Sequence, residues 1–242
     1  MDVGLPPEDA PGRVAVRARA AALGPAVDET QRRLRAVRRP RPVLGRQRER
    51  ALTDRQRELL DQMERLFAGG FADLTMAGLA ARLNCSLRTL YALAASRDEL
   101  VLIVVDRNLW RIGRMARDAI GHDLAPLDAV RAYLEAATVA VSGWTEAFAG
   151  DLATVPAAQR LADEHNEYLF AVTRTLLDLA VERGDIPDVD TAAVARVLAG
   201  VGLFFSRPEV IPTLRSSPKE AADELVDLVL RGLMSLSMEE RQ

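Results

Sequence analysis

The chain has 242 residues, of which 49% are hydrophobic and 28% are charged, with one cysteine and a formal net charge of −3. These proportions are typical of a globular protein with one large domain or two small ones, and a single cysteine excludes a scaffold held by internal disulfides. No apolar run reaches the roughly 18 residues of a membrane helix, and the sequence does not open like a signal peptide. We therefore expect no membrane partner and a reduced, cytoplasmic location.

Residues 1–52 predict a basic, largely disordered N-terminal arm. They carry 12 arginines against six acidic residues, hold six of the 12 prolines and contain no aromatic residue. Such a segment buries too little apolar surface to offset the entropy lost on ordering. Two interpretations remain open for the arginines of residues 32–41: a solvated tail, or a counter-charge for DNA phosphates.

Residues 53–105 predict four helices. Thr53 and Gln56 have the spacing of a capping box at the start of the first, and Gly69 and Gly70 supply the left-handed conformations that end it. Short helices are expected over residues 75–83 and 86–93, and a long helix over residues 96–120. The two short helices and their three-residue turn have the dimensions of a helix-turn-helix. Leu87 and Leu90 are expected to hold the second of them against the first.

Residues 106–242 predict further helices at 126–152, 157–183, 190–205 and 217–236, each bounded by a cap, a proline or a glycine. No period-two alternation appears between turn signals, so we expect no sheet. The fold class predicted from the residues is therefore all-α.

Residues 59–105 resemble the DNA-binding domain of the TetR (tetracycline-repressor-like) family of bacterial regulators. The matching residues are Phe67, Gly70 and Phe71 at the end of the first helix, Thr75 at the next cap, Leu90 and Tyr91 in the recognition helix, and Ser96, Arg97, Asp98 and Leu100 after it. The resemblance implies a three-helix DNA-binding head over 53–105 and a helical domain over 106–242 that binds an effector and dimerises.

The function implied by this resemblance is that of a repressor. It would bind a palindromic operator in duplex DNA as a homodimer and be released by an unknown small-molecule effector. Dimerisation would use residues 190–206 and 218–236. The candidate contacts are Val194, Val197, Leu198, Val201, Leu225, Leu228 and Val229, unless this face packs within its own subunit. An alternative is a helical regulator that acts through protein contacts without binding DNA.

The residues expected to contact DNA are Thr75, Ser86, Leu87, Arg88, Thr89, Tyr91 and Arg97. Arg88 and Thr89 are expected to read bases, and Tyr91 to contact phosphate through its hydroxyl. Leu87 either touches a thymine methyl group or is packed. A cation such as Arg97 is electrostatically unfavourable at a helix N-terminus. A phosphate partner would explain why an arginine is found there.

The large apolar side chains of the second half form either a bundle core or the wall of an effector cavity. The candidates for the cavity are Trp110, Tyr133, Trp144, Phe148 and Tyr168. We expect no cofactor and no metal site, because neither His122 nor His165 has other ligands at metal spacing. Cys85 is expected to be packed. Since the sequence also lacks a phosphate-binding loop and a catalytic triad, we expect no enzymatic activity.

Overall fold

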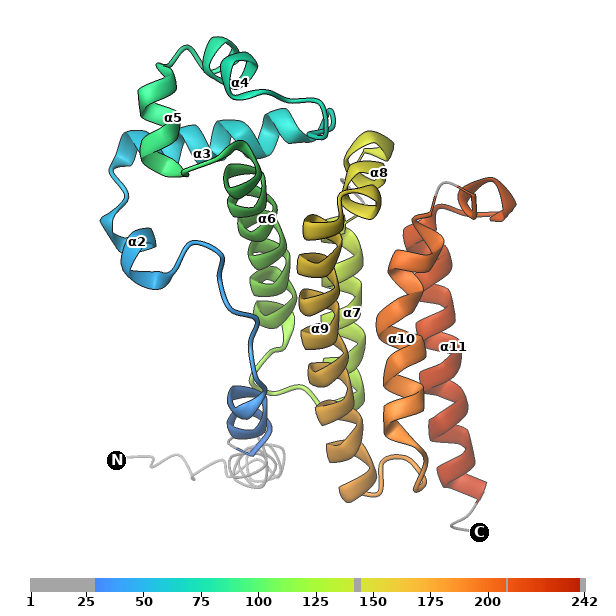
Figure 1. The fold of residues 1–242 in the computed structure, drawn as a ribbon. Coiled ribbons are helices and arrows are strands. Elements are labelled where there is room, and N and C mark those ends of the chain that lie inside the picture. Colours follow the sequence, from blue (N-terminus) through green and yellow to red (C-terminus); the bar gives the residue numbers. More distant parts are fainter. Residues whose placement is uncertain (1–28, 142–144, 208, 240–242) are drawn as a thin grey trace, which may run out of the picture.

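The computed structural model describes residues 29–141, 145–207 and 209–239, and these contain helices and no strand (Figure 1). The expected all-α fold class is confirmed. Residues 29–36 form the first described helical segment. The elements that follow are α2 (Arg46–Ala51), α3 (Asp54–Phe67), α4 (Met76–Arg82), α5 (Leu87–Leu93), α6 (Arg97–Ala119), α7 (Pro126–Val141), α8 (Glu146–Thr154), α9 (Pro156–Glu182), α10 (Thr191–Phe205), the 3₁₀ helix η1 (Ile211–Thr213) and α11 (Pro218–Glu239).

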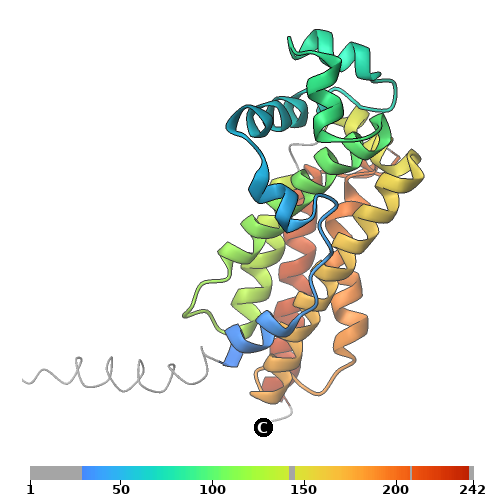
Figure 2. The same cartoon turned by 60° about the vertical axis from the view of Figure 1, so that its left-hand side comes forward.

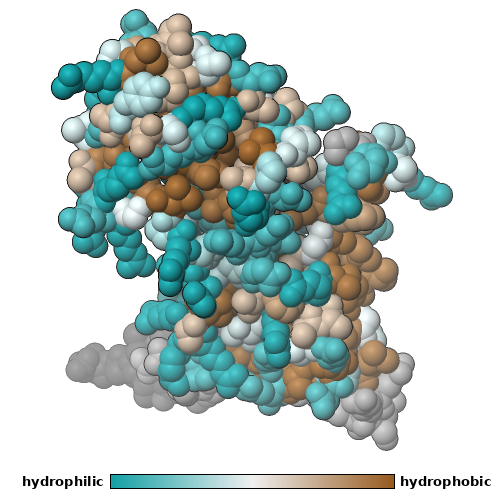
Figure 3. Space-filling model, in the orientation of Figure 1, coloured by the Kyte–Doolittle hydropathy of each residue, from teal (hydrophilic) through white to brown (hydrophobic). Residues whose placement is uncertain are grey.

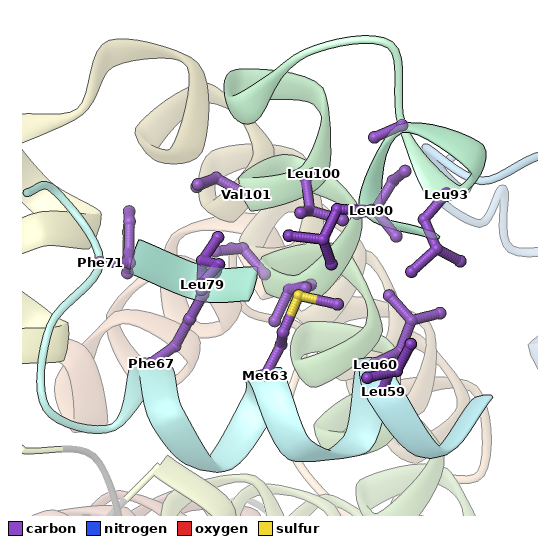
Figure 4. Close-up of a cluster of buried hydrophobic side chains, with 14 of the residues drawn as sticks. Leu59, Leu60, Met63, Phe67, Phe71, Leu79, Leu90, Leu93, Leu100 and Val101 are labelled. Atoms are coloured by element: carbon purple, nitrogen blue, oxygen red, sulfur yellow. The ribbon is translucent and has the colours of Figure 1, made fainter. Parts of the chain in front are cut away.

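Two packed units share one long helix. Helices α3, α4 and α5 form a head at one end of α6, while the body is a bundle in which α6 packs on α7 and α9, and α9 on α10 (Figure 1). The head core includes Leu60, Met63, Phe67, Leu79 and Leu90, all fully buried (Figure 4). Because α6 supplies buried residues to both units, any tilt of this helix within the body moves the head.

Side-chain caps fix where several helices begin. Thr53 and Gln56 form the expected reciprocal capping box at the start of α3. Ser217 and Glu220 do the same before α11, where each backbone N–H is bonded to the other side chain. Each pair satisfies two donors that would otherwise lack a partner in the first helical turn.

The expectation of a single helix over residues 126–152 is wrong, because α7 ends at Val141 and α8 begins at Glu146. Thr145 is the N-cap of α8: its hydroxyl accepts the Phe148 N–H at 3.2 Å and also donates to the Ala68 carbonyl in the head. A side chain that bonds the backbone in this way competes with helix continuation. The new start directs α8 toward the head.

The expectation of disorder is also wrong for residues 29–52, which we call the strap. Leu34 is fully buried in the body core, whereas Leu44 and Leu52 are buried in the head core. Arg33 donates to both carboxylate oxygens of Glu182, at 2.6 and 2.7 Å. The strap needs few apolar residues because the remainder of the chain provides the surface on which they pack. Residues 1–28 lie outside the described residues.

The course of the strap argues against the DNA counter-charge interpretation of the arginines in residues 32–41. The strap begins at the end of the body opposite the head and runs along the bundle toward α2 (Figures 1 and 2). Arg32 and Arg33 are paired with Glu29 there, and Arg38, Arg39 and Arg41 line a hollow with residues of α9. The basic stretch therefore lies against the body, away from α5.

Candidate nucleic-acid interface

The helix-turn-helix is built by two caps and one left-handed residue. Thr75 caps α4 by accepting the Gly78 N–H at 3.0 Å, and Ser86 caps α5 by accepting the Thr89 N–H at 3.1 Å. Between the two helices, Asn84 has a φ of 48°. Asparagine tolerates this region better than most residues, so the turn reverses the chain within three residues.

Helix α5 has one buried face and one exposed face. Leu90 and Leu93 are buried in the head core. Leu87 and Tyr91 are 44% and 53% exposed, and Arg88 is exposed beside them. Leu87 therefore does not hold α5 against the head as expected. Two large apolar side chains and a cation are presented outward on a helix that is otherwise firmly packed.

The hydroxyls at the start of α5 are already engaged with one another. The Ser86 and Thr89 hydroxyl oxygens lie 2.8 Å apart, and Thr89 is half-buried. Each hydroxyl keeps further lone pairs or a proton for an external group. Ser86 and Thr75 thus both set the helix starts and remain near the exposed surface.

Arg97 holds the loop between α3 and α4. Its guanidinium donates to the carbonyls of Leu74 (2.8 Å), Phe71 (2.6 Å) and Ala72. A fourth contact joins it to Asp98 at 2.9 Å. These bonds account for a cation at this helix start without phosphate, so the structure gives Arg97 a different role from the expected one.

Helix α8 makes a second contact between body and head. Asp151 accepts the backbone N–H groups of Phe71 and Ala72, the latter at 2.8 Å. The ring of Phe148 meets that of Phe71 edge-on at 5.6 Å between centroids. Phe148 therefore belongs to the head core and does not line the effector cavity as expected.

The strap makes a third contact with the head. Arg48 donates to the Leu93 carbonyl (2.9 Å) at the end of α5 and to Glu99 (3.0 Å). The Ala95 N–H and Arg48 both bond the Glu99 carboxylate and hold its pKa below the ordinary value. The head is thus held by α6, α8 and the strap together.

A buried carboxylate joins the strap to two helices of the body. Asp106 on α6 is 2% exposed. Its two oxygens lie 2.8 Å from the backbone nitrogen of Val43 in the strap and 3.0 Å from Nε2 of His165 on α9. Sequence reasoning missed this residue, although an acid directly after the apolar run 100–105 was a usable signal.

The expected effector-cavity residues are only partly brought together. Tyr133 and Tyr168 line a cavity of about 110 Å³ between α6, α7, α9 and α10, with His165 and Asn166, which were not expected. Burial raises the pKa of the Tyr133 phenol, so it stays protonated. Trp110 lies instead beneath the strap, edge-on to His165 at 5.5 Å. Trp144 lies outside the described residues.

The described residues give few other candidates for chemistry. They contain no group of three or more residues that could hold a metal ion. No helix among them is both long and apolar enough to cross a membrane. Cys85 is half-buried and packs against the head core.

Comparison with known proteins identifies the fold. No protein-family model and no curated protein matches the chain. Among solved structures, it is similar to the TetR family transcriptional regulator PfmR from Thermus thermophilus, with 24% identity, a TM-score of 0.54, and coverage of 72% of this chain and 98% of that one. A TetR-like transcriptional regulator from Rhodococcus sp. RHA1 has 23% identity and a TM-score of 0.56, and the match covers 75% of this chain and 98% of that one. AibR in complex with isovaleryl coenzyme A and operator DNA has 16% identity and a TM-score of 0.54, and the match covers 71% of this chain and 96% of that one.

Proposed function

We propose that this chain, which has the fold of TetR family transcriptional regulators, binds duplex DNA and regulates transcription. The observation that carries the proposal is the exposed face of α5, where Leu87, Arg88 and Tyr91 stand over a buried leucine face. A short helix presented in this way fits the major groove. In this proposal the chain acts as a repressor, has no enzymatic activity and binds DNA in the cytoplasm.

Each exposed residue has a proposed role. Arg88 reads a base, most simply the O6 and N7 acceptors of guanine, and Leu87 touches a thymine methyl group. Thr89 contacts a neighbouring base, and the Tyr91, Thr75 and Ser86 hydroxyls contact phosphate. Arg97 is left out of this set, because its guanidinium is bonded to the loop before α4. It positions α4 and α5 instead.

Release by an effector is proposed to act through the three contacts that hold the head. A molecule bound between α6 and α9 in the body shifts α6, α8 or the strap, and with them the head. Two heads read a palindrome only when their separation matches successive major grooves, about 34–36 Å. The complex of AibR with isovaleryl coenzyme A and operator DNA shows that this fold accommodates both ligands in that protein.

Selection from a random pool of duplexes tests the proposal, because it does not require the operator sequence to be known. We expect the full chain to enrich one palindromic sequence and to bind it more tightly than a scrambled duplex. Affinity should fall as salt rises, with about 0.9 added to the log–log slope for each phosphate contacted. Fluorescence anisotropy of labelled duplexes measures both effects. A folded chain that retains no duplex would contradict DNA binding and favour the alternative, a regulator that acts on another protein.

The homodimer is proposed to form through the outer faces of α10 and α11. Figure 3 shows hydrophobic residues gathered on the side of the body where Figure 1 places these helices. The exposed apolar residues there are Val197, Leu203, Phe204, Leu228 and Leu236. Leu198 and Val201, also expected at the interface, are buried in their own subunit. An exposed apolar patch of this kind marks an interaction surface.

Leu228→Arg should convert the dimer into a folded monomer. Leu228 is 67% exposed, so the change costs the isolated subunit little, whereas it buries a charge in the proposed interface. Light scattering measures the mass, and circular dichroism checks the helix content. Met115→Arg is the matched control, since Met115 is 43% exposed on α6 and should leave the dimer intact. A dimeric Leu228→Arg chain would place the interface elsewhere.

A further inference from the structure

We infer that a basic hollow beneath the strap, together with the interhelical cavity beside it, binds a small organic anion with a short apolar tail. The inference rests on the proposed function, because it names the chemical class of the effector. The anionic group would lie among arginines of α6 and the strap. The tail would lie between α6, α7, α9 and α10.

The hollow is predominantly cationic. It has a volume of about 480 Å³ and lies between the strap and the second half of α6. Its charged lining residues are Arg39, Arg114, Arg117 and Asp118, and its other titratable lining residues are His122, His165 and Tyr168. Three arginines therefore face one carboxylate, and such a concave site of one sign attracts the opposite charge.

Ion pairs with described residues do not neutralise the charges of these three arginines. Arg33 and Arg107 are held by carboxylates, whereas Arg39, Arg114 and Arg117 form no ion pair with any described residue. Nη1 of Arg117 is buried without a hydrogen-bond partner, and so is Nε1 of Trp110 in the same hollow. Buried donors without an acceptor are costly, and a carboxylate or phosphate oxygen would supply one.

The interhelical cavity adjoins this hollow and differs in character. Gly113, His165 and Tyr168 line both of them. Among the described residues that line the cavity there is no Asp, Glu, Lys or Arg. Its volume of about 110 Å³ is several times the roughly 10–15 Å³ that a single water needs in a cavity. The cavity thus suits a tail of a few carbons, with the charge left outside.

Gly113 lies at the boundary between the two spaces. A Cβ atom added at Gly113 would meet no atom within 4 Å, so packing alone does not require glycine there. Glycine is unfavourable inside a helix such as α6 relative to alanine. At this position, which lines both spaces, glycine leaves room for a ligand.

The strap gives this site a route to the head. Arg39 belongs to the strap, which bonds Asp106 through the Val43 N–H. Further along the strap, Arg48 donates to the carbonyl at the end of α5. An anion held between Arg39 and Arg117 would therefore join the strap to α6. The ligand and the head would be coupled through two paths, α6 and the strap.

Calorimetric titration of the full chain with hexanoate, hexyl phosphate and hexanol tests the inference. We expect saturable binding of hexanoate or hexyl phosphate, and hexanol binding at least about tenfold more weakly, because it lacks the charge. Whichever anion binds more tightly tells a carboxylate effector from a phosphate one. Failure of both anions to bind, or hexanol binding as tightly as they do, would overturn the inference.

Two variants distinguish the site of the ligand's anionic group from the site of its apolar tail. Arg117→Gln should weaken binding of the anion about tenfold and leave hexanol unaffected. Gly113→Leu should weaken both about tenfold or more, since it fills the shared boundary. Arg65→Gln is the matched control, because Arg65 is exposed on α3 and its loss removes the same charge. Equal anion affinity in Arg117→Gln and Arg65→Gln would overturn the proposed site. If the wild-type chain without ligand did not bind DNA, that result would count only against the proposed function.

Discussion

Replacing Phe71 with alanine should lower the free energy of unfolding by about 3–5 kcal/mol, the usual cost of emptying a buried phenylalanine site. Phe71 is fully buried, stacks on Phe67 at 5.5 Å and meets Phe148 edge-on at 5.6 Å. The expected loss is a large part of the roughly 5–15 kcal/mol that stabilises a typical protein. Because Phe148 belongs to α8, the substitution also loosens the contact between head and body.

Chemical denaturation followed by circular dichroism measures this loss. Tyr91→Ala is the matched control: it removes another aromatic ring, but one that is 53% exposed, so stability should change by no more than about 0.5 kcal/mol. If Phe71→Ala and Tyr91→Ala had equal effects on stability, the burial of Phe71 between Phe67 and Phe148 would be contradicted.

The helices that carry the proposed interface could be predicted because their signals are local. Thr53, Thr75, Ser86 and Ser96 each bond a backbone N–H three residues later, and each lies at a helix start. A cap and the spacing of apolar residues depend only on neighbours in the sequence. The same signals predicted that α5 is short and that one face of it remains exposed.

What could not be predicted depends on contacts between distant parts of the chain. Leu34 is buried only because the body supplies a surface, and its neighbour Arg33 pairs with Glu182. The partners of Arg97 are carbonyls of a loop 23 to 26 residues earlier, so its position at a helix start suggested a phosphate partner instead. Phe148 was expected to line the effector cavity from a single helix over residues 126–152, but α8 begins at Glu146 and directs Phe148 into the head.

Replacing Arg88 with alanine should weaken binding to the selected operator by about 1–3 kcal/mol, or about 5-fold to 150-fold. Arg88 is exposed on α5 and makes no ion pair with a described residue, so its guanidinium is free to reach a base edge. The loss should be confined to the base pair that it contacts, because an arginine bonded to guanine discriminates among bases. Tyr91→Phe, which removes only the hydroxyl, should weaken binding to all duplexes by a similar factor.

Whether α5 reads DNA is the central question for this protein, and one measurement tests it most directly. Anisotropy titrations compare the wild-type chain, Arg88→Ala and Arg65→Gln on the selected operator and on operators with each base pair changed in turn. We expect Arg88→Ala to lose its preference at one position in each half-site, while Arg65→Gln, which removes the same charge from α3, keeps every preference. If Arg88→Ala kept the full set of preferences, or weakened all duplexes to the same extent, α5 would not be the element that reads the sequence.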